Sequence, residues 1–172
     1  MLRLHPTRYS STEGFTFPEA LVVIVIATVL AAIAAPNLLG LLNNRRSTIV
    51  RDDIVQAIRQ TQSEATSRRT PQILEIDTTA NPLPTLDIPG SGLKPVANGD
   101  VPGETLTVTV RDGDGNVNPV QQIEFDENGA VEPDTVVLPL IIEVTFNGRG
   151  RRCAIVQSLL GTIRAESGNA CN

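Results

Sequence analysis

The chain has 172 residues and a formal net charge of −5; hydrophobic residues make up 41% of it, and aromatic residues 3%. This apolar content suffices for a packed core and argues against a disordered chain. The negative net charge argues against non-specific electrostatic binding to nucleic acid. The one histidine, His5, cannot complete a zinc site with two cysteines, and it offers little to histidine-based catalysis.

The most informative region is a long apolar segment near the N-terminus. No charged residue occurs from Ala20 to Asn44. A helix of this length would extend about 37 Å at 1.5 Å per residue. It would therefore span a bilayer hydrocarbon core, which is roughly 30 Å thick. The sequence predicts one membrane-spanning segment.

Three interpretations of this segment compete. A secretory signal peptide would end at the small-x-small site formed by residues 32–34, although the apolar run continues well past it. A plain single-span anchor is the second. Neither explains Glu19, because a carboxylate at the start of an apolar run is costly without a partner. Cleavage between Gly14 and Phe15, the third interpretation, would place a new α-amino group about one helical turn from Glu19.

The stretch Gly14-Phe15-Thr16-Phe17-Pro18-Glu19 resembles the type III signal of type IV prepilins and type II secretion pseudopilins. The resemblance implies that prepilin peptidase cuts after Gly14 and N-methylates Phe15. It also implies that Glu19, at the fifth mature position, guides assembly with neighbouring pilins. Pro36, at the twenty-second, is expected to kink the helix by removing a backbone donor.

The helix is expected to continue beyond the membrane to about Arg69, before Pro71. A long surface loop is predicted for residues 78–103, which are rich in Pro, Gly, Asn and Asp. Residues at helical spacing, all apolar except one threonine, define one face of the continuation: Val50, Ile54, Ala57, Ile58, Thr61 and Ala65. Alternating or apolar runs predict six strands: Gln72–Asp77, Thr105–Val110, Gln121–Phe125, Val136–Phe146, Arg152–Ser158 and Gly161–Ala165.

These elements predict an α+β fold in which a long N-terminal helix packs on an antiparallel β-sheet. The body of the chain also resembles the FimT/GspH branch of the pilin superfamily, through its helix end, its strand-turn unit at residues 123–129 and a Gly-x-x-Arg element near the C-terminus. A type IV pilin-like division follows: a leader at 1–14, a transmembrane or filament-core helix at 15–44, an amphipathic continuation at 45–70 and a β-rich globular domain at 71–172.

The two cysteines are expected to form a disulfide if the domain leaves the cytoplasm. The bond between Cys153 and Cys171 would stabilise the fold by about 3 kcal/mol in the chain-entropy picture. The run Asp112-Gly113-Asp114-Gly115-Asn116 begins like a calcium loop, with Asp112, Asp114 and Asn116 as weak candidate ligands. It lacks the glycine and glutamate of an EF-hand, and a plain turn explains it equally well. No cofactor and no other metal are expected.

A basic region near the C-terminus is a candidate DNA contact. Some FimT-type pilins bind DNA through a Gly-Arg-x-Arg element, and the corresponding Gly161-Thr162-Ile163-Arg164 lacks one arginine. The nearby Arg149, Arg151 and Arg152 could compensate for it. A solvated turn explains these arginines as well, and no aromatic stacking platform lies nearby.

The sequence predicts a non-enzymatic protein, since cleavage after Gly14 would remove His5. The resemblance implies a minor pilin of a type IV pilus, with a part in pilus initiation or DNA uptake. It would be held in the inner membrane by a single span, with its C-terminal domain outside the cytoplasm. Its expected partners are other pilins, prepilin peptidase and the inner-membrane assembly platform. The alternatives are a type II secretion pseudopilin and a secreted soluble binding domain released after Ala34.

Overall fold

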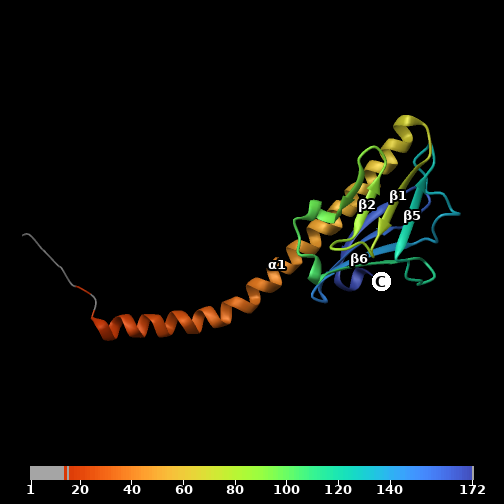
Figure 1. Cartoon of the computed structure of the whole chain (residues 1–172). Helices are drawn as coiled ribbons and strands as arrows, with labels where there is room; N and C mark the ends of the chain where they lie inside the picture. The colour runs from red at the N-terminus through yellow and green to blue at the C-terminus, as the bar shows by residue number, and fades with distance from the viewer. Residues whose placement is uncertain (1–13, 15, 172) are drawn as a thin grey trace, which may run out of the picture. The chain divides into compact units, whose positions relative to one another are not determined.

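The computed structural model describes residue 14 and residues 16–171, apart from the side chains of residues 35–37 and 39. The chain divides into two compact units, Met1–Leu38 and Leu39–Asn172. The helix α1, Phe17–Arg68, begins in the first unit and ends in the second (Figure 1). The four predicted segment boundaries are not tested by this division and stay predictions.

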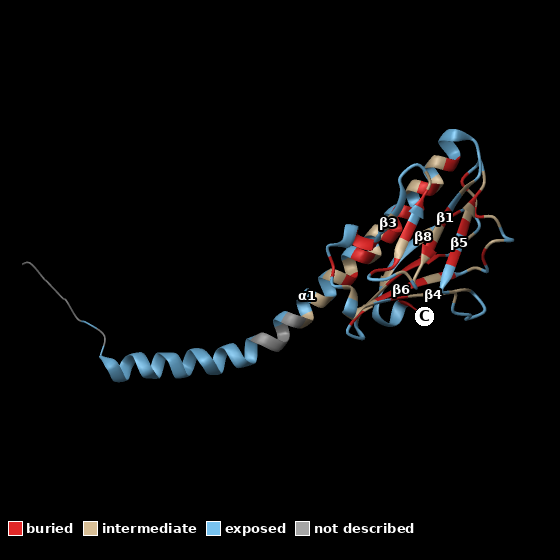
Figure 2. Cartoon of the chain, viewed as in Figure 1, coloured by how far each residue is buried: buried red, intermediate tan, exposed pale blue. Residues whose placement is uncertain are grey.

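The first part of α1 is apolar on all sides. Every residue from Phe17 to Ala34 is exposed, and the stretch has a mean hydropathy of 2.4 (Figure 2). By length and composition it is able to cross a membrane. The predicted apolar N-terminal helix is thus confirmed, while its insertion in a membrane stays a prediction.

The later part of α1 has one buried face, as the spacing predicts. Val50, Ile54, Ile58, Thr61 and Ala65 are completely buried, and Ala57 is 1% exposed. The hydroxyl of Thr61 donates to the carbonyl of Ala57 at 3.0 Å, so this polar group is buried with a partner. The helix ends because Arg69 adopts a left-handed conformation, with φ of 53°, and Pro71 disfavours helix at Thr70.

The strands form two four-stranded antiparallel sheets rather than the one sheet predicted. The first sheet has the order β3-β2-β1-β5 and the second the order β4-β6-β7-β8. The first comprises β1 (Gln72–Asp77), β2 (Thr85–Ile88), β3 (Gly92–Pro95) and β5 (Val120–Phe125). The second comprises β4 (Leu106–Arg111), β6 (Leu140–Phe146), β7 (Arg149–Val156) and β8 (Ile163–Ser167).

The prediction of a long surface loop over 78–103 is wrong. This segment holds β2, β3 and two short 3-10 helices, η1 (Val96–Gly99) and the start of η2 (Gly103–Thr105). Pro89 and Gly90 lie in the turn between β2 and β3, in which the Ser91 amide donates to the Ile88 carbonyl at 3.0 Å. Leu86 and Ile88 alternate into the core, so β2 is a strand despite its length of four residues.

In the second sheet, the boundaries of β4 and β8 and the end of β7 differ from prediction by one or two residues, and the starts of β6 and β7 differ by more. β6 begins at Leu140 rather than Val136, because Pro139 has no amide hydrogen to donate to a neighbouring strand. β7 begins at Arg149 rather than Arg152. Asn147 and Gly148, both with positive φ (52° and 66°), form the two-residue turn that joins it to β6.

Two apolar clusters stabilise the second unit. The large one joins the buried face of α1 to one face of each sheet, with Phe125 and Phe146 among its largest side chains. The small one lies on the opposite face of the second sheet and contains Ile155 and the two cysteines. Burial of these side chains is the main contribution to folding, at about 25 cal/mol per Å².

Candidate functional site

The start of α1 holds the predicted processing and assembly residues. Gly14 is exposed, and no other described part of the chain lies within 4 Å of the position that a Cβ atom would take there. Phe15 lies outside the described residues. Glu19 is exposed in the first turn of α1, and its carboxylate accepts a long hydrogen bond, 3.4 Å, from the Thr16 amide. An acidic group at this helix end is favoured by the helix dipole.

Glu19 is the only charged residue between Phe17 and Asn44. Within the described residues it forms no salt bridge. A single carboxylate therefore stands at one end of an otherwise apolar, exposed helical surface. Pro36 lies within α1, but its side chain is outside the described residues and the kink stays a prediction.

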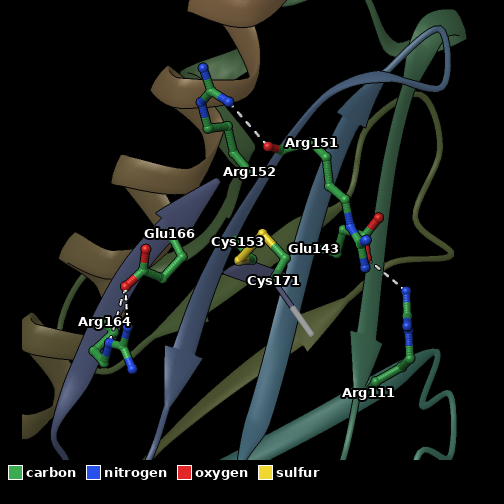
Figure 3. The surroundings of a disulfide bond; sticks show 8 residues. All are labelled: Arg111, Glu143, Arg151, Arg152, Cys153, Arg164, Glu166 and Cys171. Carbon is green, nitrogen blue, oxygen red and sulfur yellow. Dashed lines mark hydrogen bonds and ion pairs between the residues drawn. A yellow bond between two sulfur atoms is a disulfide. The ribbon is translucent and has the colours of Figure 1, made fainter. Parts of the chain in front are cut away.

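The four arginines of the predicted DNA patch do not gather on one face. Arg149 is exposed beside the turn that begins β7. Arg151 and Arg152 are consecutive in the same strand, so their side chains point to opposite faces of the second sheet (Figure 3). Arg164 lies on β8 and forms a salt bridge with Glu166.

Arg151 belongs to an ionic cluster on the outer face of the second sheet, the face opposite α1. Its Nη2 lies 2.8 Å from Glu143 Oε2, and Arg111 Nη2 lies 2.7 Å from the same oxygen. The Glu143 side chain is 14% exposed. One carboxylate thus offsets one of the two positive charges of this cluster, which reduces what the two guanidinium groups offer to a polyanion. DNA contact by the four arginines stays a prediction.

Arg152 points towards α1 instead. Its Nε donates to the Thr48 hydroxyl at 3.2 Å, and its Nη1 donates to the Arg151 carbonyl at 3.1 Å. These two bonds hold the guanidinium against the helix. Arg152 was expected to contribute to a nucleic-acid patch, but here it forms part of a groove along α1.

The predicted disulfide is confirmed: Cys153 in β7 is bonded to Cys171 in the C-terminal 3-10 helix η3, Gly168–Cys171 (Figure 3). Both cysteines are buried, at 0% and 1% exposure, beside Ile155 and the partly buried Ile141. The bond therefore fastens the end of the chain over an apolar patch on the outer face of the second sheet.

The weak calcium candidate is organised as a turn. The Asp112 carboxylate accepts hydrogen bonds from the amides of Asp114 and Asn116, at 3.1 and 2.8 Å, and from the Asn116 side chain at 3.0 Å. These bonds, first of all that from the Asn116 side chain, hold the pKa of Asp112 below its usual range. Within the described residues, no three His, Cys, Asp or Glu side chains group as metal ligands.

A groove along α1 is a feature that the sequence analysis missed. It has a volume of about 460 Å³ and is lined by Leu41, Asn44, Arg45, Thr48, Ile49 and Arg152. The first five residues recur at intervals of three and four, so they share one side of the helix. That spacing was available in the sequence, but the contribution of Arg152 from β7 was not.

No protein-family model and no curated protein matches the chain. Its structure is similar to a crystal structure of the type IV minor pilin FimU from Pseudomonas aeruginosa, with 18% identity over 74% of this chain and 98% of that one and a TM-score of 0.47. Another crystal form of FimU gives 20% identity, coverages of 72% and 98% and a TM-score of 0.43. Both structures are of a type IV minor pilin.

Proposed function

We propose that the chain is a pilin-like structural subunit, processed after Gly14 and assembled with other pilins through the first part of α1. The observation that carries the proposal is that every residue from Phe17 to Ala34 is exposed. A soluble domain does not leave so long an apolar surface in water. We therefore expect lipid to cover this segment before assembly and the helices of other subunits to cover it afterwards, as in a pilin.

Glu19 supports assembly rather than simple anchoring. A plain anchor gains nothing from a carboxylate at the beginning of its apolar helix, where insertion scales assign it a cost. In a bundle of such helices the carboxylate can meet the new α-amino group of Phe15 from a neighbouring subunit. An ion pair at this depth would fix the axial stagger between subunits, because leaving either charge without a partner is unfavourable.

We propose further that the subunit is a minor pilin of a type IV pilus, with a part in pilus initiation, and that it is not an enzyme. Cleavage after Gly14 leaves no histidine in the mature chain, which removes the usual acid–base and nucleophile-activating group. A part in DNA uptake has less support, because Glu143 and Glu166 pair with Arg151 and Arg164.

Intact-mass and N-terminal peptide analysis of the membrane-bound protein tests the processing step. With prepilin peptidase present, we expect a chain that begins at N-methylated Phe15. Gly14→Val should leave the uncut precursor, whereas the matched leader variant Thr12→Val should be cut normally. A mature chain that begins near residue 35 would overturn the proposal and indicate a secreted soluble domain.

Deletion of the protein in its native host tests which filament it serves. We expect loss of surface pili with secretion unchanged, and restoration by the wild-type chain but not by Glu19→Ala. Loss of protein secretion with pili intact would assign the chain to a type II secretion pseudopilus. Normal pili and normal secretion after the deletion, or full restoration of lost pili by Glu19→Ala, would contradict the assembly role.

A further inference from the structure

The groove along α1 combines an apolar wall with two cationic groups. Leu41 and Ile49, which are 49% and 53% exposed, contribute aliphatic surface. Arg45 and Arg152 add guanidinium groups from the helix and from β7. The lining is predominantly apolar, because long arginine side chains also expose aliphatic stems. The groove thus suits a ligand that is apolar and carries a negative charge.

Neither arginine of the groove is neutralised within the described part of the chain. The six salt bridges found there involve other cations, and the bonds of Arg152 go to a hydroxyl and a carbonyl. These neutral partners position the guanidinium without cancelling its charge. The neighbouring pocket on α1 shares Ile49 with this groove but has more acidic than basic residues in its lining, namely Asp52, Asp53 and Asp100 against Arg46.

One segment of the chain has the complementary chemistry. Phe17–Ala34 is an exposed apolar helix, and Glu19 is its single charged residue. An apolar helix with one carboxylate fits a groove with apolar walls and guanidinium groups, by helix-in-groove burial and by charge. A second copy can supply this segment, because the proposed function brings several subunits together.

We propose that this groove receives the N-terminal helix of a second copy of the chain, with the Glu19 carboxylate of that copy bound by Arg45 and Arg152. The inference rests on the proposed assembly function and specifies where on a subunit the incoming helix docks. It gives the carboxylate a guanidinium partner in addition to an α-amino group. Because guanidinium donors form a rigid fork, such a contact also fixes the register of the incoming helix.

A charge-exchange experiment on the full-length protein in assembled filaments tests the contact. Glu19 and Arg45 flank the predicted membrane span at opposite ends, so copies side by side in one bilayer do not bring them together, whereas subunits offset along a filament can. Two tagged copies are co-expressed, and a photo-crosslinking amino acid replaces Ile49 in the groove of one of them. Glu19→Arg in the incoming copy, or Arg45→Glu with Arg152→Glu in the receiving copy, should lower crosslinking about tenfold by placing like charges together. The two changed copies combined should restore crosslinking to within about threefold of wild type.

The control is the double variant Arg59→Glu with Arg149→Glu, which makes the same charge change at exposed positions outside the groove. It should crosslink as the wild type does. Arg45→Glu alone, at an exposed helix position, should still lower crosslinking severalfold. This variant keeps the test valid if Arg152→Glu impairs folding, because it leaves the bond to Thr48 intact.

Two outcomes would overturn the inference and leave the proposed function standing. In the first, groove variants crosslink and assemble normally while Glu19→Ala still prevents assembly, so the carboxylate binds elsewhere. In the second, groove variants weaken retention in membranes without changing crosslinking, so the groove binds lipid headgroups. If Glu19→Ala and the groove variants all assemble normally, the proposed function fails as well.

Discussion

The two parts of α1 form the same secondary structure but have different surroundings. From Phe17 to Ala34 the helix is apolar on every side and exposed throughout, whereas from Val50 to Ala65 only one side is apolar and that side is buried. A one-sided apolar stripe finds its partner within the chain, here the two sheets. An apolar surface on all sides has no such one-sided match, and the proposed function supplies its partner as a membrane or another subunit.

The largest expected effect compares one isoleucine from each part. Ile54→Ala should lower the free energy of unfolding of the second unit by about 2–5 kcal/mol, because it removes a fully buried side chain. Ile24→Ala, at a site that is 60% exposed, should leave that stability within about 0.5 kcal/mol of wild type. Guanidinium unfolding of the full-length protein in detergent, followed by circular dichroism, measures both. Equal losses of unfolding free energy in the two variants would contradict the conclusion that only the later part of α1 packs against the sheets.

The disulfide allows a test of a second apolar surface, the patch around Ile155 on the outer face of the second sheet, which η3 covers. Replacing Cys153 and Cys171 with alanine should cost about 3 kcal/mol, the value for closing a loop of this size, since 18 residues separate the pair. Thermal unfolding with and without reductant measures the loss. The wild type should have no titratable thiol and should approach the variant when reduced. An unchanged melting temperature would mean that η3 stays in place without the bond.

A smaller effect is expected from the contact that joins the later part of α1 to the first sheet. Asp53 accepts from Lys94 Nζ and from the Ala97 amide, both at 2.8 Å, and its side chain is 12% exposed. Asp53→Ala should cost about 1–3 kcal/mol, because it leaves a partly buried ammonium and an amide without their acceptor.

Asp52→Ala is the matched control for that change. Asp52 is 60% exposed and pairs only with the adjacent Arg51 among the described residues, so its loss should cost about 0–0.5 kcal/mol. The two substitutions make the same change in helix propensity, so the difference between them isolates the contact with β3 and η1. Urea midpoints of the two variants that coincide would show that the contact adds nothing to stability.

The sequence predicts those elements whose signals are local. The long helix and six of the strands follow from apolar periodicity over five or more residues, and the disulfide follows from cysteine usage and compartment. β2 and β3 escape this reasoning because four residues carry little periodicity, and the prolines and glycines around them also suit a loop. The Asn147-Gly148 turn had a recognisable hairpin signal, and it would have placed the start of β7 correctly.

The candidate sites likewise divide into those with a local sequence signal and those formed by residues far apart in the sequence. Gly14, Phe15 and Glu19 are close in sequence, so the processing and assembly motif is legible without a structure, although no structural observation tests it. The groove could not be predicted from the sequence, because 104 residues separate Thr48 from Arg152. The basic run at residues 149–152 shows the converse: alternation along β7 sends neighbouring arginines to opposite faces, so composition alone does not make a patch.

The smallest expected effect concerns the turn after β5, which the later part of α1 contacts. The Gln62 side chain donates to the Gly129 carbonyl at 2.7 Å. In the same turn, hydrogen bonds from the Ala130 amide and then from Asn128 hold the pKa of Asp126 below its usual range. Because the folded pKa is depressed, the charged carboxylate stabilises the fold above its unfolded pKa of about 3.9. This contribution is lost as the pH falls through the folded pKa.

Asp126→Asn tests this dependence, since the amide oxygen can still accept the backbone bonds but does not titrate. The urea midpoint of the wild type should exceed that of the variant near pH 6, and the difference should shrink as the pH falls below about 4. Asp134→Asn is the control, because the Asp134 carboxylate accepts no hydrogen bond within the described residues. A difference that is independent of pH would indicate that the turn holds α1 by geometry alone, without a contribution from charge.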